Sequence, residues 1–360
     1  MLTVEDVVPY LLRQGLLEEP VVADQPMKVF DVSRRNRNFK LLADGGRGYF
    51  LKQGATADTA RTVTREAGLF RWFGQSRHAD LLSPLLPRFR LFDPDRCTLV
   101  VELSDSESLY EYQRQHRRLP RAVGQALGDA LGTLHRLTVI PADDTGSALP
   151  APADCVFALH RPRLEILATA SPARLAFVKL LQQSEEVTAF LDQLNRDVRN
   201  QCVIHGDARW DNCRVTWIDA VRRPSVHFVD WELGGVGDPR ADIGMVFGEC
   251  LSTWLQSIPL VRDAAAADSL PPARVPLSAM QPAMRAFWRA YVRRMALDAV
   301  SASEWLYAAM RYAGSRLVQA MYEELQGVSR LPATAIYAVQ LTINISARPR
   351  DAAAVLLGLP

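Results

Sequence analysis

A short polar segment, HGDARWDN at 205–212, directly follows the apolar run CVI. It places Asp207 and Asn212 five residues apart on a predicted loop. Loops that are held by a buried strand are favoured places for catalytic residues. The same spacing also occurs in ordinary surface turns rich in Asp and Asn. The chemistry of this segment therefore depends on what lies further along the chain.

A second apolar run, VHFV at 226–229, leads directly to Asp230. We predict that this strand forms a hairpin with the strand after Asn212, which brings Asn212 and Asp230 together. A carboxamide oxygen and a carboxylate suit Mg²⁺, which keeps waters and phosphate oxygens as its other ligands. Asp207 would then be left to orient an incoming hydroxyl, as phosphoryl transfer requires.

The N-terminal part of the chain supplies a third element of the same chemistry. GYFLKQG places Lys52 on a predicted strand, and TREAGLF places Glu66 on the helix that follows. A strand Lys held by a helix Glu contacts the nucleotide phosphates in kinases. Taken singly, Lys52 could be an exposed strand cation and Glu66 part of a solvated helix face. Their order, upstream of the polar loop and Asp230, favours phosphoryl transfer.

The elements that position these residues fall into two predicted lobes of an α+β fold. Residues 1–103 read as a helix over 4–17 and a small antiparallel sheet with one main helix after its third strand. Thr3 and Asp6 predict a capping box at the start of the first helix. We predict a hinge over 104–109 and a larger, mostly helical lobe over 110–360, with helices over 119–137, 240–257 and about 280–327. The Pro/Ala-rich segments 141–155 and 263–282 are predicted loops without an assigned role.

Composition excludes several classes of protein. The 360 residues carry 42 basic and 40 acidic side chains, so no global charge favours nucleic acid or an anionic membrane. The five cysteines stand far apart and form neither a metal-binding spacing nor a disulfide framework. No apolar run is long enough to cross a bilayer, and the first residues do not read as a signal peptide. We therefore expect a cytoplasmic protein with no membrane or nucleic-acid partner.

The chain resembles the aminoglycoside phosphotransferase and choline kinase group, the small-molecule branch of the protein-kinase-like fold. The segments that carry the resemblance run in family order: NRNFKL, YFLK, REAGLF, LGTLH, HGDARWDN, VDWE and GDPRADIG.

The resemblance implies a two-lobed kinase fold with ATP between the lobes and with Mg²⁺ as the metal. It implies Asp207 as the catalytic base, Asn212 and Asp230 as metal ligands, and Lys52 as the phosphate contact. Glu66 would hold Lys52.

The hairpin expected to cover the phosphates, DVSRRNRNFK, departs from protein kinases because it has no glycine. We predict that Ser33, Asn36 and backbone amides cap the phosphates instead. Arg34, Arg35 and Arg37 add positive charge there, or belong to a solvated face. We also assign two residues before the hinge to nucleotide binding: Glu102 and Leu103.

Arg209 stands two residues after Asp207, where Ser/Thr protein kinases carry a Lys that meets the γ-phosphate. A guanidinium at this position could stabilise the transferring group. The alternative is a surface salt bridge. For His205 we expect a structural hydrogen-bonding role, and for Asp242 a bracing contact with the catalytic segment.

The acceptor is expected to be a hydroxyl-bearing small molecule. Beyond residue 240 arginines outnumber acids, so the helical lobe does not favour a polycationic aminoglycoside. Arg285, Arg289, Arg293, Arg294 and Arg311 could face an anionic acceptor. An alternative acceptor is Ser or Thr of a peptide, phosphorylated before elimination by a partner lyase. A third possibility is a pseudokinase that only binds nucleotide.

Overall fold

The computed structural model describes most of the chain. The predicted loop 141–155 and the first part of the predicted loop 263–282 lie outside the described residues. The described ranges are 1–18, 27–43, 48–104, 106–140, 159–162, 164–218, 223–259 and 272–360.

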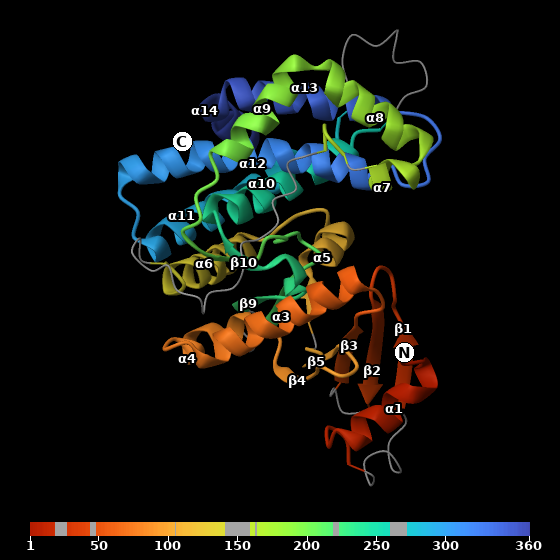
Figure 1. Cartoon of the computed structure of the whole chain (residues 1–360). Helices are drawn as coiled ribbons and strands as arrows, with labels where there is room; N and C mark the ends of the chain where they lie inside the picture. Colours follow the sequence, from red (N-terminus) through yellow and green to blue (C-terminus); the bar gives the residue numbers. More distant parts are fainter. Residues whose placement is uncertain are drawn as a thin grey trace.

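A five-stranded antiparallel sheet forms the N-terminal lobe, with strand order β1-β2-β3-β5-β4 (Figure 1). Side chains alternate between the two faces of each strand. Leu51 therefore packs with helix α1 (Val4–Arg13) on one face, whereas Lys52, opposite Asn38 and Leu99, faces the other way. The strands are β1 (Met27–Asp31), β2 (Arg37–Ala43), β3 (Gly48–Gln53), β4 (Phe89–Asp93) and β5 (Thr98–Glu102).

Helix α1 (Val4–Arg13) begins as predicted but ends earlier than residue 17. The Thr3 backbone N–H donates to Asp6 Oδ2 at 2.9 Å, which completes the predicted capping box. Gly15 adopts φ +65°, a left-handed conformation that commonly ends helices. The predicted helix was therefore too long at its C-terminus.

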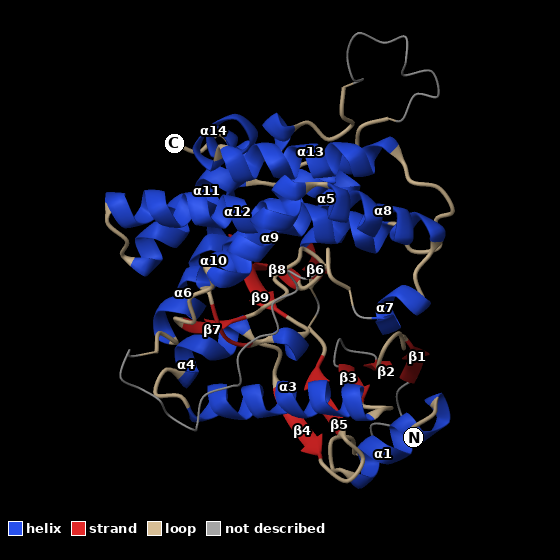
Figure 2. Ribbon diagram, turned by 45° about the horizontal axis from the view of Figure 1, so that its top comes forward, coloured by secondary structure: helices blue, strands red, loops and turns tan. Residues whose placement is uncertain are grey.

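Helix α3 (Ala57–Gln75) lies between the sheet and the helical lobe (Figures 1 and 2). Its buried face carries Val63, Phe70 and Phe73, and the Phe73 ring meets Trp231 of the other lobe at 5.1 Å between centroids. Glu66 lies on the same buried face. The helix therefore brings a carboxylate to the place where the two lobes meet.

The rest of the chain is mainly helical, with two short antiparallel sheets, β6-β8-β9 and β7-β10. The sequence did not predict α4, α13, α14, β6 or β10. The helices are α4 (Ala79–Leu82), α5 (Leu109–His116), α6 (Arg121–Leu137), α7 (Leu164–Ala168), α8 (Pro172–Gln183), α9 (Glu185–Arg196), α10 (Pro239–Gln256), α11 (Gln281–Met295), α12 (Ala299–Glu324), α13 (Ala333–Ala347) and α14 (Pro349–Ala352). The strands are β6 (Glu107–Ser108), β7 (Cys202–Ile204), β8 (Cys213–Ile218), β9 (Arg223–Phe228) and β10 (Gly235–Gly237).

Two predicted boundaries in this lobe were wrong. The strand before Asp230 ends at Phe228, and Asp230 itself adopts a left-handed conformation with φ +63°. The helical stretch expected over about 280–327 is divided into α11 and α12, because Ala296 at φ +55° ends the first helix.

The strand β6 lies within the segment predicted as the hinge and pairs with β8 of the helical lobe. Next to it, Ser104 Oγ lies 2.9 Å from His227 Nε2, and Arg214 Nε donates to Ser106 Oγ at 3.2 Å. The connecting segment is therefore attached to the β8–β9 hairpin. We retain 1–103, 104–109 and 110–360 as the proposed division of the chain.

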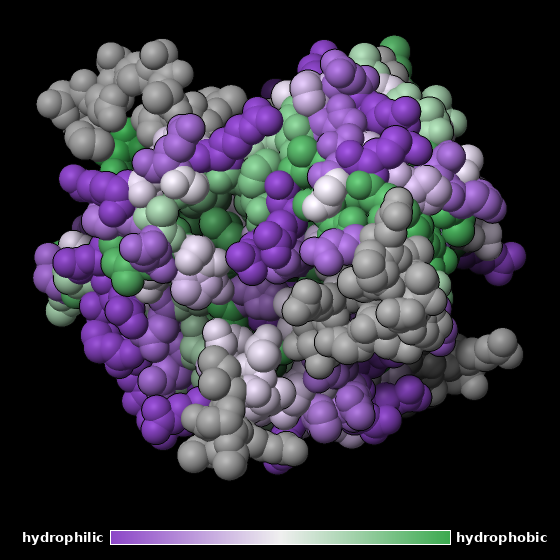
Figure 3. Space-filling view, turned by 90° about the horizontal axis from the view of Figure 1, so that it is seen from below, coloured by the Kyte–Doolittle hydropathy of each residue, from purple (hydrophilic) through white to green (hydrophobic). Residues whose placement is uncertain are grey.

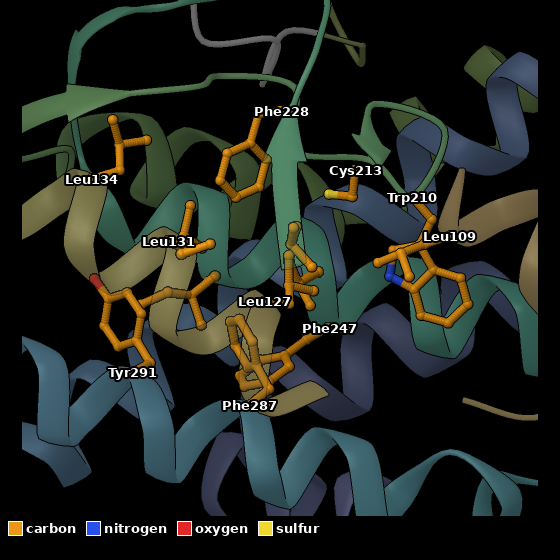
Figure 4. Close-up of a cluster of buried hydrophobic side chains, with 14 of the residues drawn as sticks. Leu109, Leu127, Leu131, Leu134, Trp210, Cys213, Phe228, Phe247, Phe287 and Tyr291 are labelled. Carbon is orange, nitrogen blue, oxygen red and sulfur yellow. The ribbon is translucent and has the colours of Figure 1, made fainter. Parts of the chain in front are cut away.

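The main hydrophobic core lies where α6, α10 and α11 meet the β8–β9 hairpin (Figure 4). Helices α6 and α11 approach closely at two glycines. A Cβ on Gly124 would lie 2.1 Å from Ala283 O, and one on Gly128 would lie 2.2 Å from Phe287 O. The face seen from below mixes hydrophilic and apolar residues (Figure 3). Among helices in the described part of the chain, none combines the length and apolar character needed to cross a bilayer.

Candidate active site

Lys52 lies at the centre of a buried charge cluster between the lobes. Its ammonium is 2.8 Å from Glu66 Oε2 and 3.7 Å from Glu232 Oε2, and it contacts Asp230 Oδ1. Glu66 Oε1 also accepts the Trp231 backbone N–H at 3.0 Å. The strand Lys and the helix Glu are thus paired as predicted, and both meet the loop that follows β9.

The charge states of this cluster follow from its neighbours. Burial by itself lowers the pKa of Lys52, but the carboxylates of Glu66, Asp230 and Glu232 outweigh burial and raise it. Burial likewise acts to raise the pKa of Asp230, but Lys52 outweighs burial and lowers it. Lys52 is therefore a fixed cation, and Asp230 is a carboxylate at neutral pH.

The loop after β7 is shaped by one glycine and one aspartate. Gly206 has φ +74°, and a Cβ there would lie 2.5 Å from Leu233 O, so only glycine fits. Asp242 accepts the backbone N–H groups of His205 at 2.7 Å and Gly206 at 2.9 Å. This confirms the expected bracing role of Asp242, which also lies 3.2 Å from His135 Nε2.

His205 is fully buried and has a structural role, as expected. Its Nε2 lies 3.0 Å from Val229 O, and its Nδ1 lies 3.2 Å from the Asp207 backbone nitrogen. Burial lowers the pKa of the imidazole. The neutral ring therefore connects the catalytic loop to the residue just before Asp230.

Asp207 is only 7% exposed and is held by its neighbours in the loop. Asn212 Nδ2 donates to Asp207 Oδ2 and to Asp207 O, both at 2.9 Å, and Arg209 Nη2 lies 3.1 Å from Oδ2. Burial raises the pKa of Asp207 to about 6, while Arg209 and Arg316 act in the opposite direction. Such a carboxylate is ionised at neutral pH and more basic than an exposed one.

Asn212 and Asp230 fit a Mg²⁺ site of the predicted kind. The Val229 N–H donates to Asn212 O at 2.9 Å, so the β8–β9 hairpin brings the two side chains to the same end. Because Asn212 Nδ2 bonds to Asp207, the amide turns its Oδ1 away from that residue. Within the described ranges, no three His, Cys, Asp or Glu side chains could hold a metal alone. Mg²⁺ needs only one or two protein ligands beside water and phosphate oxygens.

A cleft of about 430 Å³ between the lobes collects most of the predicted site residues. Ser33 and Asp207 do not line it, and Asp207 reaches it through Asn212. Apolar side chains on both sides of Lys52, including Phe50, Leu99 and Val101, form part of its wall. The predicted site residues that line the cleft are Asn36, Lys52, Glu66, Glu102, Leu103, Arg209, Asn212 and Asp230.

The hairpin before the cleft differs in part from the prediction. Ser33 Oγ accepts the Asn38 N–H at 3.0 Å and the Ser33 N–H donates to Asp31 Oδ1 at 2.9 Å, so both groups close the hairpin. Asn36 is buried and donates to Glu232 Oε2 at 3.2 Å, which links the hairpin to the other lobe. Arg34 and Arg35 line the cleft.

The third hairpin arginine and the residues before the hinge make other contacts. Arg37 donates to Leu2 O at 3.2 Å and is not part of the cleft wall. The Leu103 N–H donates to Gly48 O and the Glu102 N–H to Arg88 O, both at 2.9 Å. These two amides are thus used within the sheet, although both residues line the cleft.

Three charged residues next to the catalytic loop were not predicted from the sequence: Glu249, Arg316 and Glu323. Arg209 Nη1 lies 3.5 Å from Glu323 Oε2, and Arg316 contacts both glutamates. Their only signal in the sequence is charge on otherwise apolar helices, which many surface residues share. Arg209 forms salt bridges and lines the cleft, so the two roles weighed for it are compatible.

The two-lobed arrangement, with a strand Lys, a helix Glu and a polar loop beside one cleft, is that of the protein-kinase-like fold. The phosphotransferase enzyme family matches residues 27–279. The match covers more than half of the sequence, and the chain belongs to this family. The predicted fold and family resemblance are confirmed.

Solved structures of similar fold include a choline kinase from Cryptosporidium parvum Iowa II, with 12% identity, 99% of each chain covered and a TM-score of 0.55. They also include wild-type aminoglycoside 2'-phosphotransferase-IIIa in its GDP complex, with 11% identity, 97% of this chain and 100% of that chain covered, and a TM-score of 0.54. At these identities the likeness shows the fold alone. None of the curated proteins compared with the chain matches it.

Proposed function

We propose that this chain is a kinase that transfers the γ-phosphate of ATP to a hydroxyl group of a small molecule, with Mg²⁺ as cofactor. The observation that carries the proposal is that Lys52, Asn212 and Asp230 line the same cleft, with Asp207 directly behind Asn212. Two proteins of similar fold, a choline kinase and an aminoglycoside phosphotransferase solved with GDP, support a nucleotide and a hydroxyl acceptor.

Each residue has a distinct part in the proposed reaction. Lys52, oriented by Glu66, holds phosphate oxygens. Asp207 takes the proton of the acceptor hydroxyl as its oxygen bonds to the γ-phosphorus. The bond from that phosphorus to the bridging oxygen breaks, and ADP leaves. Mg²⁺ held by Asn212 and Asp230 would neutralise phosphate charge. Arg209 adds a guanidinium near the transferred group.

The charge of the cleft supports a nucleotide and argues against a polycationic acceptor. Arginines and lysines outnumber acids along its wall, and every acid of the wall except Glu102 contacts Lys52. The helix arginines considered for an anionic acceptor do not line the cleft. Arg293 and Arg294 contact Asp129 at 3.1 and 3.3 Å, and Arg311 contacts Asp197 at 3.0 Å.

A cytoplasmic location fits this proposal, because ATP is the phosphate donor there. Cys202, Cys213 and Cys250 are buried free thiols, which suits a reducing compartment. We propose no nucleic-acid or membrane partner.

The proposal is tested by an acceptor screen with the purified chain, Mg²⁺ and either ATP or GTP. Hydroxylated metabolites, aminoglycosides and Ser/Thr peptides are scored by ADP or GDP release and by the mass of the phosphorylated product. We expect a small-molecule product that Asp207→Asn protein does not form. A phosphopeptide product would instead favour the peptide kinase and its partner lyase. Nucleotide binding without any product would favour the pseudokinase.

A further inference from the structure

A ring of ion pairs, completed by one backbone hydrogen bond, begins and ends at the loop that carries Asp207. It starts at Asp207, whose Oδ2 is 3.1 Å from Arg209 Nη2. Arg209 Nη1 continues to Glu323 Oε2 of α12 at 3.5 Å. Arg209 and Glu323 are the accessible part of the ring, with 31% and 36% of their side chains exposed.

The ring closes through two buried residues. Arg316, also on α12, contacts both carboxylate oxygens of Glu323 at 3.0 Å and Glu249 Oε1 of α10 at 2.8 Å. Glu249 Oε2 accepts the backbone N–H of Trp210 at 3.3 Å. Trp210 directly follows Arg209, so α10 and α12 hold two consecutive loop residues.

Burial and packing hold the Arg316 side chain in place within the ring. Its side chain is only 5% exposed and packs on Gly248, where a Cβ would lie 2.5 Å from Arg316 Cβ. Two carboxylates satisfy this guanidinium, and removing one partner from a buried ion pair leaves an uncompensated charge. A glycine on α10 therefore makes room for the arginine that joins the two helices to the loop.

Arg209 retains unused hydrogen-bonding capacity. Its Nε is buried and has no acceptor among the described residues. Nη2 is directed to Asp207 and Nη1 to Glu323, and the second N–H of each Nη group can donate to a bound anion in the cleft that Arg209 lines.

We propose that Glu249, Arg316 and Glu323 are positioning residues that hold Arg209 beside the transferred phosphoryl group. This inference rests on the proposed kinase function. Glu323 draws the Arg209 guanidinium away from sole pairing with Asp207. Arg316 pairs with both Glu323 and Glu249, and Glu249 fixes the backbone at Trp210. The effect on the reaction passes through Arg209.

The first test measures loop position without any activity. Amide hydrogen exchange of a peptide covering 205–213 is compared among wild type, Glu249→Gln, Arg316→Lys and Glu323→Gln protein. We expect faster exchange at Trp210 in the Glu249 and Arg316 variants. Glu324→Gln, at an exposed neighbour on α12, serves as the matched control and should exchange like wild type. Unchanged exchange in both variants would overturn the positioning role.

The second test measures Mg·ATP turnover, with water as the acceptor. Glu323→Gln should lower kcat for ADP release by roughly tenfold, the equivalent of one charge-assisted hydrogen bond, and leave the KM for ATP within about twofold. Arg209→Ala should lower kcat at least as much, and adding Glu323→Gln to it should have little further effect. If Glu323→Gln still lowers kcat by roughly tenfold when residue 209 is already alanine, Glu323 does not act through Arg209, and the inference is overturned.

The two tests also separate this inference from the kinase proposal. A wild-type protein that neither binds Mg·ATP nor releases ADP would contradict the proposed function, and hydrogen exchange would then decide the loop-positioning claim. An active wild type with unchanged kcat in Glu323→Gln protein would overturn the inference and leave the proposed function intact.

Discussion

The buried Asp207 carboxylate is the residue on which the proposed chemistry depends most directly. Asp207→Asn keeps the size of the side chain and removes its ability to take a proton. We expect turnover to fall by roughly 10²–10⁴-fold, the range of general-base contributions, with nearly unchanged Mg·ATP affinity. Calorimetric titration and ADP release measure the two effects. Wild-type turnover in the variant would show that Asp207 is not the base.

The pKa of Asp207 predicts a direction for the pH dependence. Because burial raises it to about 6, a growing fraction of the carboxyl is protonated below that pH and cannot accept a proton. A metal ion bound at Asn212 would lower the pKa of Asp207, and the pH at which turnover falls would then be lower as well. Turnover should therefore fall as pH falls through 6 or below. A kcat that rises toward acid between pH 7 and 5 would contradict this assignment.

At the residue scale, the sequence identified the groups that stand in local motifs. Lys52, Asp207, Asn212 and Asp230 could be assigned because strand ends and a hairpin predict where they meet. Glu249 and Arg316 could not, because their partners lie on helices far apart in the sequence. The hydrogen bond of the Ser33 hydroxyl with Asn38 could not be read from the sequence either.

The close packing of α6 against α11 depends on glycines of α6, which have no side chain at the contact. Gly128→Ala would place a Cβ against the backbone at Phe287. Such overpacking typically costs about 1–3 kcal/mol. We expect urea unfolding to show a loss of this size. Gly68→Ala is the matched control.

Gly68 lies on the exposed face of α3, and a Cβ there would meet no heavy atom within 4 Å. Alanine should stabilise this helix position by about 0.5–1 kcal/mol. A lower free energy of unfolding for Gly128→Ala protein and a higher one for Gly68→Ala protein would support the packing explanation. Equal small effects would mean that α6 and α11 can separate without cost.

Elements with a clear apolar period were predictable, and their ends were less so. The alternating strands β1–β5 and the long helices α3 and α6 appear where expected. The end of α1 and the break between α11 and α12 depend on single residues in left-handed conformations. The short strands β6 and β10 depend on partners from distant segments, which local periodicity does not reveal.

The largest hydrophobic cluster extends across both lobes. The main cluster includes Val63, Phe70 and Phe73 from α3 together with Phe228 and Phe247 from the helical lobe. We expect the whole molecule to unfold in one heat transition, seen together by circular dichroism and tryptophan fluorescence. Separate transitions for the two probes would show that the lobes are independent units.

Ligand binding should raise the stability of the whole molecule. At 100 times its Kd, Mg·ATP should stabilise the folded state by about 2.7 kcal/mol. Lys52→Met should reduce this gain, because the ammonium no longer contacts the phosphates. The ligand-induced change in Tm is the proper measure, since the substitution also leaves Glu66 and Asp230 without their cation. An equal Tm increase in both proteins would place the nucleotide elsewhere.

The burial of Lys52 has a practical consequence for chemical modification. The sequence has only four lysines, and of these Lys28 and Lys179 are exposed whereas Lys52 is 4% exposed. Amine reagents attack the accessible, unprotonated form, and Lys52 has a raised pKa as well as little accessible surface. Mild acylation should therefore attach a fluorophore or a sensor surface first at Lys28, Lys179 or the N-terminus, and more slowly at the half-buried Lys40 of the cleft wall. Lys52 would remain unlabelled in the folded protein.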